Sequence, residues 1–123
     1  TKAEDYSNAI KTYAAAIKLN PDFADAYYSL AVCEENLAKD IISGAVKVND
    51  DGTIEKVEEI DNEAEEVKVV LSDRAKETLG KLLNDAISDY GLYQDKSNEP
   101  DDRAFVDRKV KELQQLLAEN AVK

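Results

Sequence analysis

The apolar residues at the start of the chain follow a helical period that is interrupted at a proline. Ala9, Tyr13 and Ile17 recur every four residues, so they share one face of a helix over 4–19. Pro21 ends this helix, because the residue before a proline is pushed out of the α region. Beyond it, and interrupted by a glutamate, a second stripe runs at helical spacing: Phe23, Tyr27, Leu30, Leu37, Ile41, Ala45 and Val48. We expect a second helix that starts near 21–22 and extends towards 46.

The second half of the chain shows helical spacing twice more. Ser72 is a residue type that caps helices, and a long apolar face follows it: Ala75, Leu79, Leu82, Leu83, Ala86, Ile87 and Tyr90. A polar loop is predicted over 95–102. A last helix is predicted at about 101–120, with a charged face and an apolar face made of Val106, Val110, Leu113 and Leu117. The pattern as a whole predicts an all-α fold.

The segment that follows residue 48 is open to two interpretations. The run Asn-Asp-Asp-Gly at 49–52 is a turn signal. Valines before it and Thr53 and Ile54 after it allow a short β-hairpin within 45–60. We favour the alternative, a helix over 54–71, because its apolar residues step by three or four: Ile54, Val57, Ile60, Ala64, Val67 and Leu71. Either way, nine acidic residues against one base make 50–66 an acidic middle segment.

The proline turn and its flanks carry a family pattern. The tetratricopeptide repeat (TPR) is a helix pair of roughly 34 residues with the pattern W-x2-L-G-x2-Y, then A-x3-F, then P. Ala-x3-Tyr at 9–13 stands for A-x3-F, and Pro21 follows eight residues after the aromatic. Tyr-x2-Leu-Ala at 27–31 resembles the start of the next repeat, where Glu34 replaces the final Tyr. The chain thus resembles a TPR protein over about 6–39 and diverges beyond.

This resemblance implies an architecture. TPR proteins stack antiparallel helix pairs into a right-handed helical repeat, and we expect a single TPR-like domain over 1–123 with a diverged acidic middle. The chain starts inside a repeat, so we expect a C-terminal fragment of a longer protein. The first helix is apolar on more than one face, and such a helix is normally buried between neighbours. We therefore expect that self-association can occur through the exposed first helix.

Charge and composition limit the classes of partner and of chemistry that the protein can have. The net charge is −11, and an acidic surface repels phosphate backbones and anionic lipid. We therefore expect no nucleic-acid or membrane binding, whereas a basic protein or peptide partner is allowed. The chain has no histidine, no cysteine cluster and no glycine-rich phosphate loop, and its single Cys33 is interpreted as a small apolar residue. We predict no catalytic residues, no metal and no cofactor, and a protein that is not an enzyme.

One stretch resembles a calcium site. Residues 47–58 have the length of an EF-hand loop, with Asn49 and Asp51 at its third and fifth positions and Glu58 at its twelfth. Lys47 stands at the first position, where it removes an oxygen ligand and repels the ion. A calcium-responsive module is therefore the weakest of the functional alternatives.

The predicted partner-binding residues lie in the second helix. In TPR proteins the first helix of each pair lines the concave surface, which by position implies Asp25, Tyr28, Val32 and Glu35. These residues recur at helical spacing and share a face, although Tyr28 and Val32 can also be interpreted as core. Some TPR proteins hold the C-terminal tails of chaperones with Lys and Asn on this face. Tyr28 and Val32 occupy the comparable positions here, so that clamp is absent from this repeat.

The predicted function is a non-catalytic protein–protein interaction module that binds a partner segment on this concave face. A structural cap of a larger helical-repeat assembly is the main alternative. In the interaction-module interpretation, negative charge steers the partner segment to this face, whereas the cap itself would bind no partner.

Overall fold

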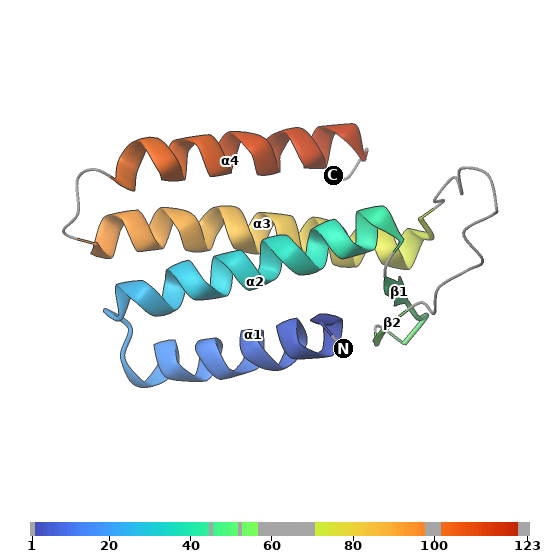
Figure 1. Ribbon diagram of the computed structural model, residues 1–123, viewed down its shortest axis with the longest axis horizontal. Coiled ribbons are helices and arrows are strands. Elements are labelled where there is room, and N and C mark those ends of the chain that lie inside the picture. The colour runs from blue at the N-terminus through green and yellow to red at the C-terminus, as the bar shows by residue number, and fades with distance from the viewer. Residues whose placement is uncertain (1, 45, 52, 57–70, 98–101, 121–123) are drawn as a thin grey trace.

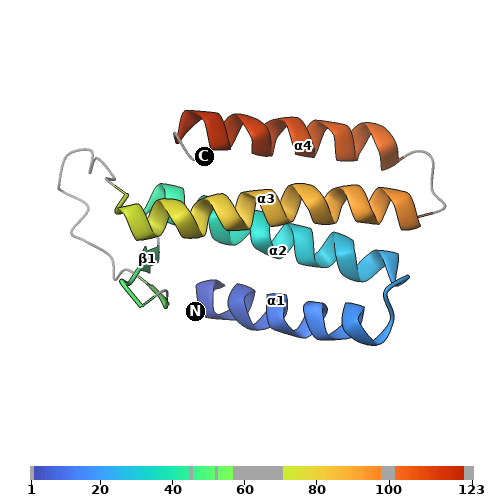
Figure 2. The same cartoon turned by 180° about the vertical axis from the view of Figure 1, so that it is seen from behind.

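The fold is a row of helices with a small hairpin at one end (Figures 1 and 2). The computed structural model describes residues 2–44, 46–51, 53–56, 71–97 and 102–120. Within these ranges the helices are α1 (Lys2–Leu19), α2 (Ala24–Ser43), α3 (Asp73–Lys96) and α4 (Asp102–Glu119). The hairpin consists of β1 (Val46–Val48) and β2 (Ile54–Lys56). Successive helices lie side by side and antiparallel, so the predicted all-α, TPR-like fold is confirmed.

The turn between α1 and α2 is built around the proline. The Asn20 carbonyl accepts a hydrogen bond from the Phe23 amide at 3.1 Å, and the Tyr27 hydroxyl donates to the Pro21 carbonyl at 2.9 Å. This turn occupies the residues where the second helix was expected to begin. Helix α2 therefore starts at Ala24, two to three residues later than predicted.

A glycine ends helix α2 earlier than the periodicity suggests. Gly44 has a φ of 81°, and its amide donates to the Ile41 carbonyl. This left-handed conformation closes many helices and carries no Cβ penalty in glycine. The predicted extension towards 46 is therefore wrong, and Val46 belongs to a strand instead.

The hairpin decides the ambiguous segment. Val46 pairs with Lys56 and Val48 with Ile54, in antiparallel register. Val46 and Val48 are buried while Lys47 is exposed, which is the alternation of a half-buried strand. The favoured helix is wrong at 54–56, because the tight turn lets β2 pair with β1 and bury the valines. The prediction is also wrong at Leu71, which lies outside any helix, and residues 57–70 lie outside the described residues.

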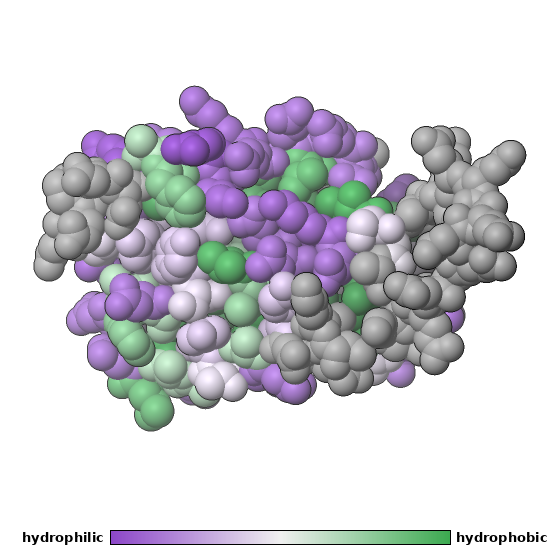
Figure 3. Space-filling model, viewed as in Figure 1, coloured by the Kyte–Doolittle hydropathy of each residue, from purple (hydrophilic) through white to green (hydrophobic). Residues whose placement is uncertain are grey.

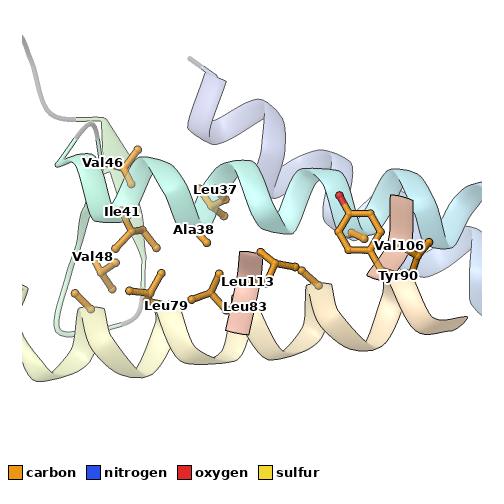
Figure 4. Close-up of a cluster of buried hydrophobic side chains, with 13 residues drawn as sticks. Leu37, Ala38, Ile41, Val46, Val48, Leu79, Leu83, Tyr90, Val106 and Leu113 are labelled. Atoms are coloured by element: carbon orange, nitrogen blue, oxygen red, sulfur yellow. The ribbon is translucent and has the colours of Figure 1, made fainter. Parts of the chain in front are cut away.

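The hydrophobic core lies mainly between α2 and α3 (Figure 4). Fully buried side chains face one another across this interface and reach α4: Leu37, Ile41, Leu79, Leu83, Tyr90, Val106 and Leu113. Ala31, Ala38 and Ala86 are 0% exposed, and such small residues let the helix backbones approach closely. Burying each leucine stabilises the fold by about 1.5–3 kcal/mol.

Helices α1 and α3 both carry the sequence Ala-Ile-x2-Tyr, at 9–13 and at 86–90, but in different surroundings. The alanine and tyrosine of this motif, Ala86 and Tyr90, are fully buried in α3, whereas Ala9 and Tyr13 of α1 are half-buried. The difference follows from position, because α3 lies between α2 and α4 while α1 lies at the edge of the row. The face seen in Figure 3 is correspondingly pale and green over α1 and mostly purple over α4.

The second half of the chain follows its prediction closely. The Ser72 side chain accepts a hydrogen bond from the Ala75 amide at 3.1 Å, so the predicted cap of α3 is confirmed. Helix α3 continues to Lys96, which places the start of the predicted polar loop in its last turn. Helix α4 begins and ends within one residue of the predicted 101–120.

Candidate functional site

The four predicted partner-binding residues all lie on α2 but in different environments. Asp25 is exposed in the first turn of the helix. Tyr28 and Val32 are partly buried and pack against the core, as the alternative interpretation of these residues allowed. Glu35 is only 3% exposed. This face of α2 is therefore exposed to solvent at Asp25 and buried at Glu35.

Glu35 is the centre of a polar network that joins three helices. One carboxylate oxygen accepts a hydrogen bond from the Tyr90 hydroxyl of α3 at 2.7 Å. The other accepts from Lys109 of α4 at 3.1 Å and from Lys39 at 2.8 Å. Burial raises the pKa of Glu35, but the hydrogen bonds from Lys39, Tyr90 and Lys109 outweigh it and leave the pKa below its ordinary value. Glu35 therefore remains charged and holds α2, α3 and α4 in register.

An aromatic cluster lies beside this network. The Tyr28 ring packs against those of Tyr93 and Phe105, with centroids 5.2 and 6.0 Å apart. Tyr90 meets both Tyr28 and Phe105 edge-on, at 6.2 and 6.3 Å. These separations and tilts are those that favour aromatic pairs. The cluster fixes where the start of α4 lies relative to α2 and α3.

An open pocket of about 490 Å³ is formed at this junction. Its described lining residues are Asp25, Tyr28, Tyr93 and Phe105, from α2, α3 and α4. Two of the predicted binding residues, Asp25 and Tyr28, are therefore brought together there, whereas Val32 and Glu35 are not among the described lining residues. Tyr93 and Phe105 were missed, because nothing in the sequence indicates which helices lie next to one another.

Two lysines of α3 and α4 each pair with an acid and lie near an aromatic ring. The Lys96 ammonium lies 5.7 Å from the centre of the Tyr27 ring and 3.3 Å from the Asp22 carboxylate. The Lys109 ammonium lies 5.8 Å from the centre of the Phe105 ring and also pairs with Glu35. The exposed Asp25, in contrast, forms no salt bridge within the described part of the chain. Among its described lining residues, the pocket thus has a carboxylate without a salt-bridge partner.

A second pair of carboxyls, which sequence reasoning also missed, lies between α2 and α3. Glu34 is 4% exposed, and its Oε1 has no hydrogen-bond partner among the described residues. Burial raises the pKa of Glu34 first, and a hydrogen bond with Asp89 and the charges of Asp89 and Asp85 raise it further. Burial also raises the pKa of Asp89. Two carboxyls in such contact hold a proton between them.

The described residues of the calcium-like stretch, 47–51 and 53–56, belong to the hairpin of β1 and β2 and its turn. Asp51 accepts hydrogen bonds from the Thr53 amide at 2.9 Å and from the Thr53 hydroxyl at 2.6 Å. The Asn49 side-chain amide also donates to the Thr53 hydroxyl. Gly52 and Glu58 lie outside the described residues. No group of three or more His, Cys, Asp or Glu residues that could hold a metal ion occurs in the part of the chain that the structure describes.

The Cys33 thiol is partly buried, and burial together with the charge of Glu34 raises its pKa, so the thiolate is disfavoured at neutral pH. Among the described helices, none is long and apolar enough to cross a membrane.

Comparison with known protein families supports the sequence resemblance. A family model described as TPR repeat matches residues 1–33, which span α1, the proline turn and the first half of α2. The chain is therefore TPR-like in this segment. No curated protein and no solved structure matches the chain. TPR repeats are generally non-catalytic modules, and they suggest protein–protein interaction as the broad function.

Proposed function

We propose that this protein binds a segment of a partner protein on the face of α2 that carries Asp25, Tyr28 and Val32. The observation that supports the proposal is the pocket, because Asp25 and Tyr28 meet Tyr93 and Phe105 there. The partner inserts one side chain into this pocket and lays its neighbouring residues along α2 past Val32. Glu35 is buried beneath this face, where it holds the helices together and does not contact the partner.

The physical basis is burial against a rigid aromatic surface. Rings that already pack against one another lose little conformational freedom when a ligand binds, so the pocket is preorganised. The network of Glu35, Tyr90 and Lys109 adds to this rigidity by holding α4 against α2 and α3. The net charge of −11 steers a basic partner to the molecule and contributes more to the association rate than to affinity.

The test is capture of a partner from cell lysate by the wild type and by Tyr28→Ala, identified by mass spectrometry. Tyr13→Ala serves as the matched control, because it also removes a half-buried tyrosine ring, but from α1 and away from the pocket. We expect a protein that the wild type and the Tyr13 variant retain and the Tyr28 variant loses. Equal retention by all three folded baits would contradict binding at this face.

A second candidate, a structural cap of a larger helical assembly, is supported by the outer surfaces of α1 and α4. Leu19 and Phe23 are 89% and 45% exposed, which leaves apolar surface at the α1 edge. The outward residues of α4 are largely charged, as in terminal units of helical repeats.

The apolar surface at the α1 edge is also suited to joining two copies of the chain. Sedimentation velocity over a range of concentrations, with Leu19→Glu as the comparison, tests this self-association; a monomer throughout would contradict it.

A further inference from the structure

The pocket beside Asp25 combines two kinds of surface that attract cations. Three of its four described lining residues are aromatic, and the fourth is an exposed carboxylate. The faces of aromatic rings carry partial negative charge and bind ammonium and guanidinium groups within about 6 Å of the ring centre. Asp25 forms no salt bridge within the described residues, so its charge is available to a ligand.

The protein already places two of its own lysines in this way, and one of them lies over Phe105, a ring that lines the pocket. Lys96 lies between Tyr27 and Asp22, and Lys109 lies near the Phe105 ring and pairs with Glu35. Both lysines have an acidic partner, so neither leaves an uncompensated positive charge to repel a cationic ligand. Tyr28 and Asp25 form a third combination of ring and acid, and among the described residues no lysine or arginine pairs with this carboxylate.

We propose that this pocket binds the side chain of an arginine in the partner segment. The proposal rests on the proposed function and names the residue that the pocket selects. A guanidinium is planar, so it can stack on the Tyr28 ring while its N–H groups donate to the Asp25 carboxylate. A lysine ammonium is a compact and more strongly hydrated charge that cannot stack in this way. The pocket of about 490 Å³ has room for the whole side chain, and the net charge of −11 favours a basic segment.

The experiment is an NMR titration of the isotope-labelled full chain with three small probes. The probes are N-acetyl-argininamide, N-acetyl-lysinamide and the uncharged N-acetyl-norleucinamide, each added to millimolar concentration. The amide signals of Asp25, Tyr28, Tyr93 and Phe105 report on the pocket. Asp25→Asn removes the carboxylate from an exposed position and preserves the fold. Asp107→Asn is the matched control, because Asp107 is exposed on α4 and points about 200° around the helix from Phe105.

We expect argininamide to shift the four pocket amides at lower concentration than either other probe. Asp25→Asn should raise the dissociation constant for argininamide by about two- to fivefold, the range of an exposed ion pair, while Asp107→Asn leaves it unchanged. Equal or tighter binding of norleucinamide would overturn the arginine inference but leave a partner-binding pocket. Stronger binding of lysinamide, or no response to argininamide, would also overturn the inference, and the partner capture with Tyr28→Ala then decides the proposed function separately.

Discussion

The Tyr90 hydroxyl donates a 2.7 Å hydrogen bond to the Glu35 carboxylate, 55 residues away in the sequence. Both side chains are buried, and Lys109 of α4 binds the other oxygen of the same carboxylate. The two residues therefore connect the TPR-like start of the chain to its diverged second half. Because the aromatic pocket is built from the same helices, this bond also fixes the geometry of the candidate site.

The first prediction concerns this bond. Tyr90→Phe removes only the hydroxyl and leaves a buried oxygen of Glu35 without its donor, so it should lower the free energy of unfolding by about 1.5–3 kcal/mol. Chemical denaturation followed by circular dichroism measures the change. Tyr13→Phe is the control, because the Tyr13 hydroxyl makes no hydrogen bond in the described structure, and it should change stability by less than about 0.5 kcal/mol. Equal effects of the two variants would contradict the role of the Glu35 network.

The second prediction compares two glycines. Gly44 closes α2 with a φ of 81°, a conformation that disfavours any side chain, so Gly44→Ala should destabilise the protein by about 1 kcal/mol. Gly91 lies within α3, and a Cβ there meets no atom within 4 Å. Gly91→Ala should therefore stabilise the protein by about 0.5–1 kcal/mol, because alanine favours the helix. Thermal denaturation of both variants shows whether each melting temperature rises or falls. Two shifts in the same direction would contradict the different roles given to Gly44 and Gly91.

The helices could be predicted from the sequence because their signals are local. The repeat of Ala9, Tyr13 and Ile17, the proline turn and the Ser72 cap each depend on residues within a few positions of one another. The hairpin was not favoured, because the stepping of apolar residues after residue 54 also fits a helix. Pairing of Val48 with Ile54 across the turn decided the outcome at 54–56.

The residues of the candidate site also differ in whether local sequence signals could reveal them. Asp25 and Tyr28 could be predicted because they share one face of a single helix. Tyr93 and Phe105 could not, because their place in the pocket depends on how α3 and α4 pack against α2. The burial of Glu34 and Glu35 could not be predicted either, since adjacent glutamates in a helix are ordinarily exposed. Each obtains its partners from α3, and Glu35 also from α4.

The third prediction concerns Val32, which lies one turn beyond Tyr28 on the proposed binding face. Val32→Glu should reduce retention of the captured partner while the helical circular dichroism signal is preserved, because Val32 is only partly buried. Val110→Glu on α4 is a matched control, since Val110 is also partly buried and packs against the core. Loss of helicity in the Val32 variant would show that this residue is core, and the face of α2 would then end at Tyr28.

The fourth prediction is a pH dependence that originates in Glu34. The ordinary pKa of a glutamate is about 4.5, and in the folded protein burial first, and then Asp89 and Asp85, raise the pKa of Glu34 above it, while Lys81 opposes them. The folded state therefore binds more protons than the unfolded state above about pH 4.5. The free energy of unfolding should therefore fall as pH rises from 5 towards 9, by up to about 1.4 kcal/mol per pH unit for one proton. Glu34→Gln keeps the shape without the titrating group and should flatten the profile, whereas Glu77→Gln, an exposed glutamate of α3, should leave it unchanged. Melting temperatures measured at intervals between pH 5 and 9 give the three profiles, and parallel curves for the wild type and Glu34→Gln would show that the buried carboxyl pair does not hold the proton.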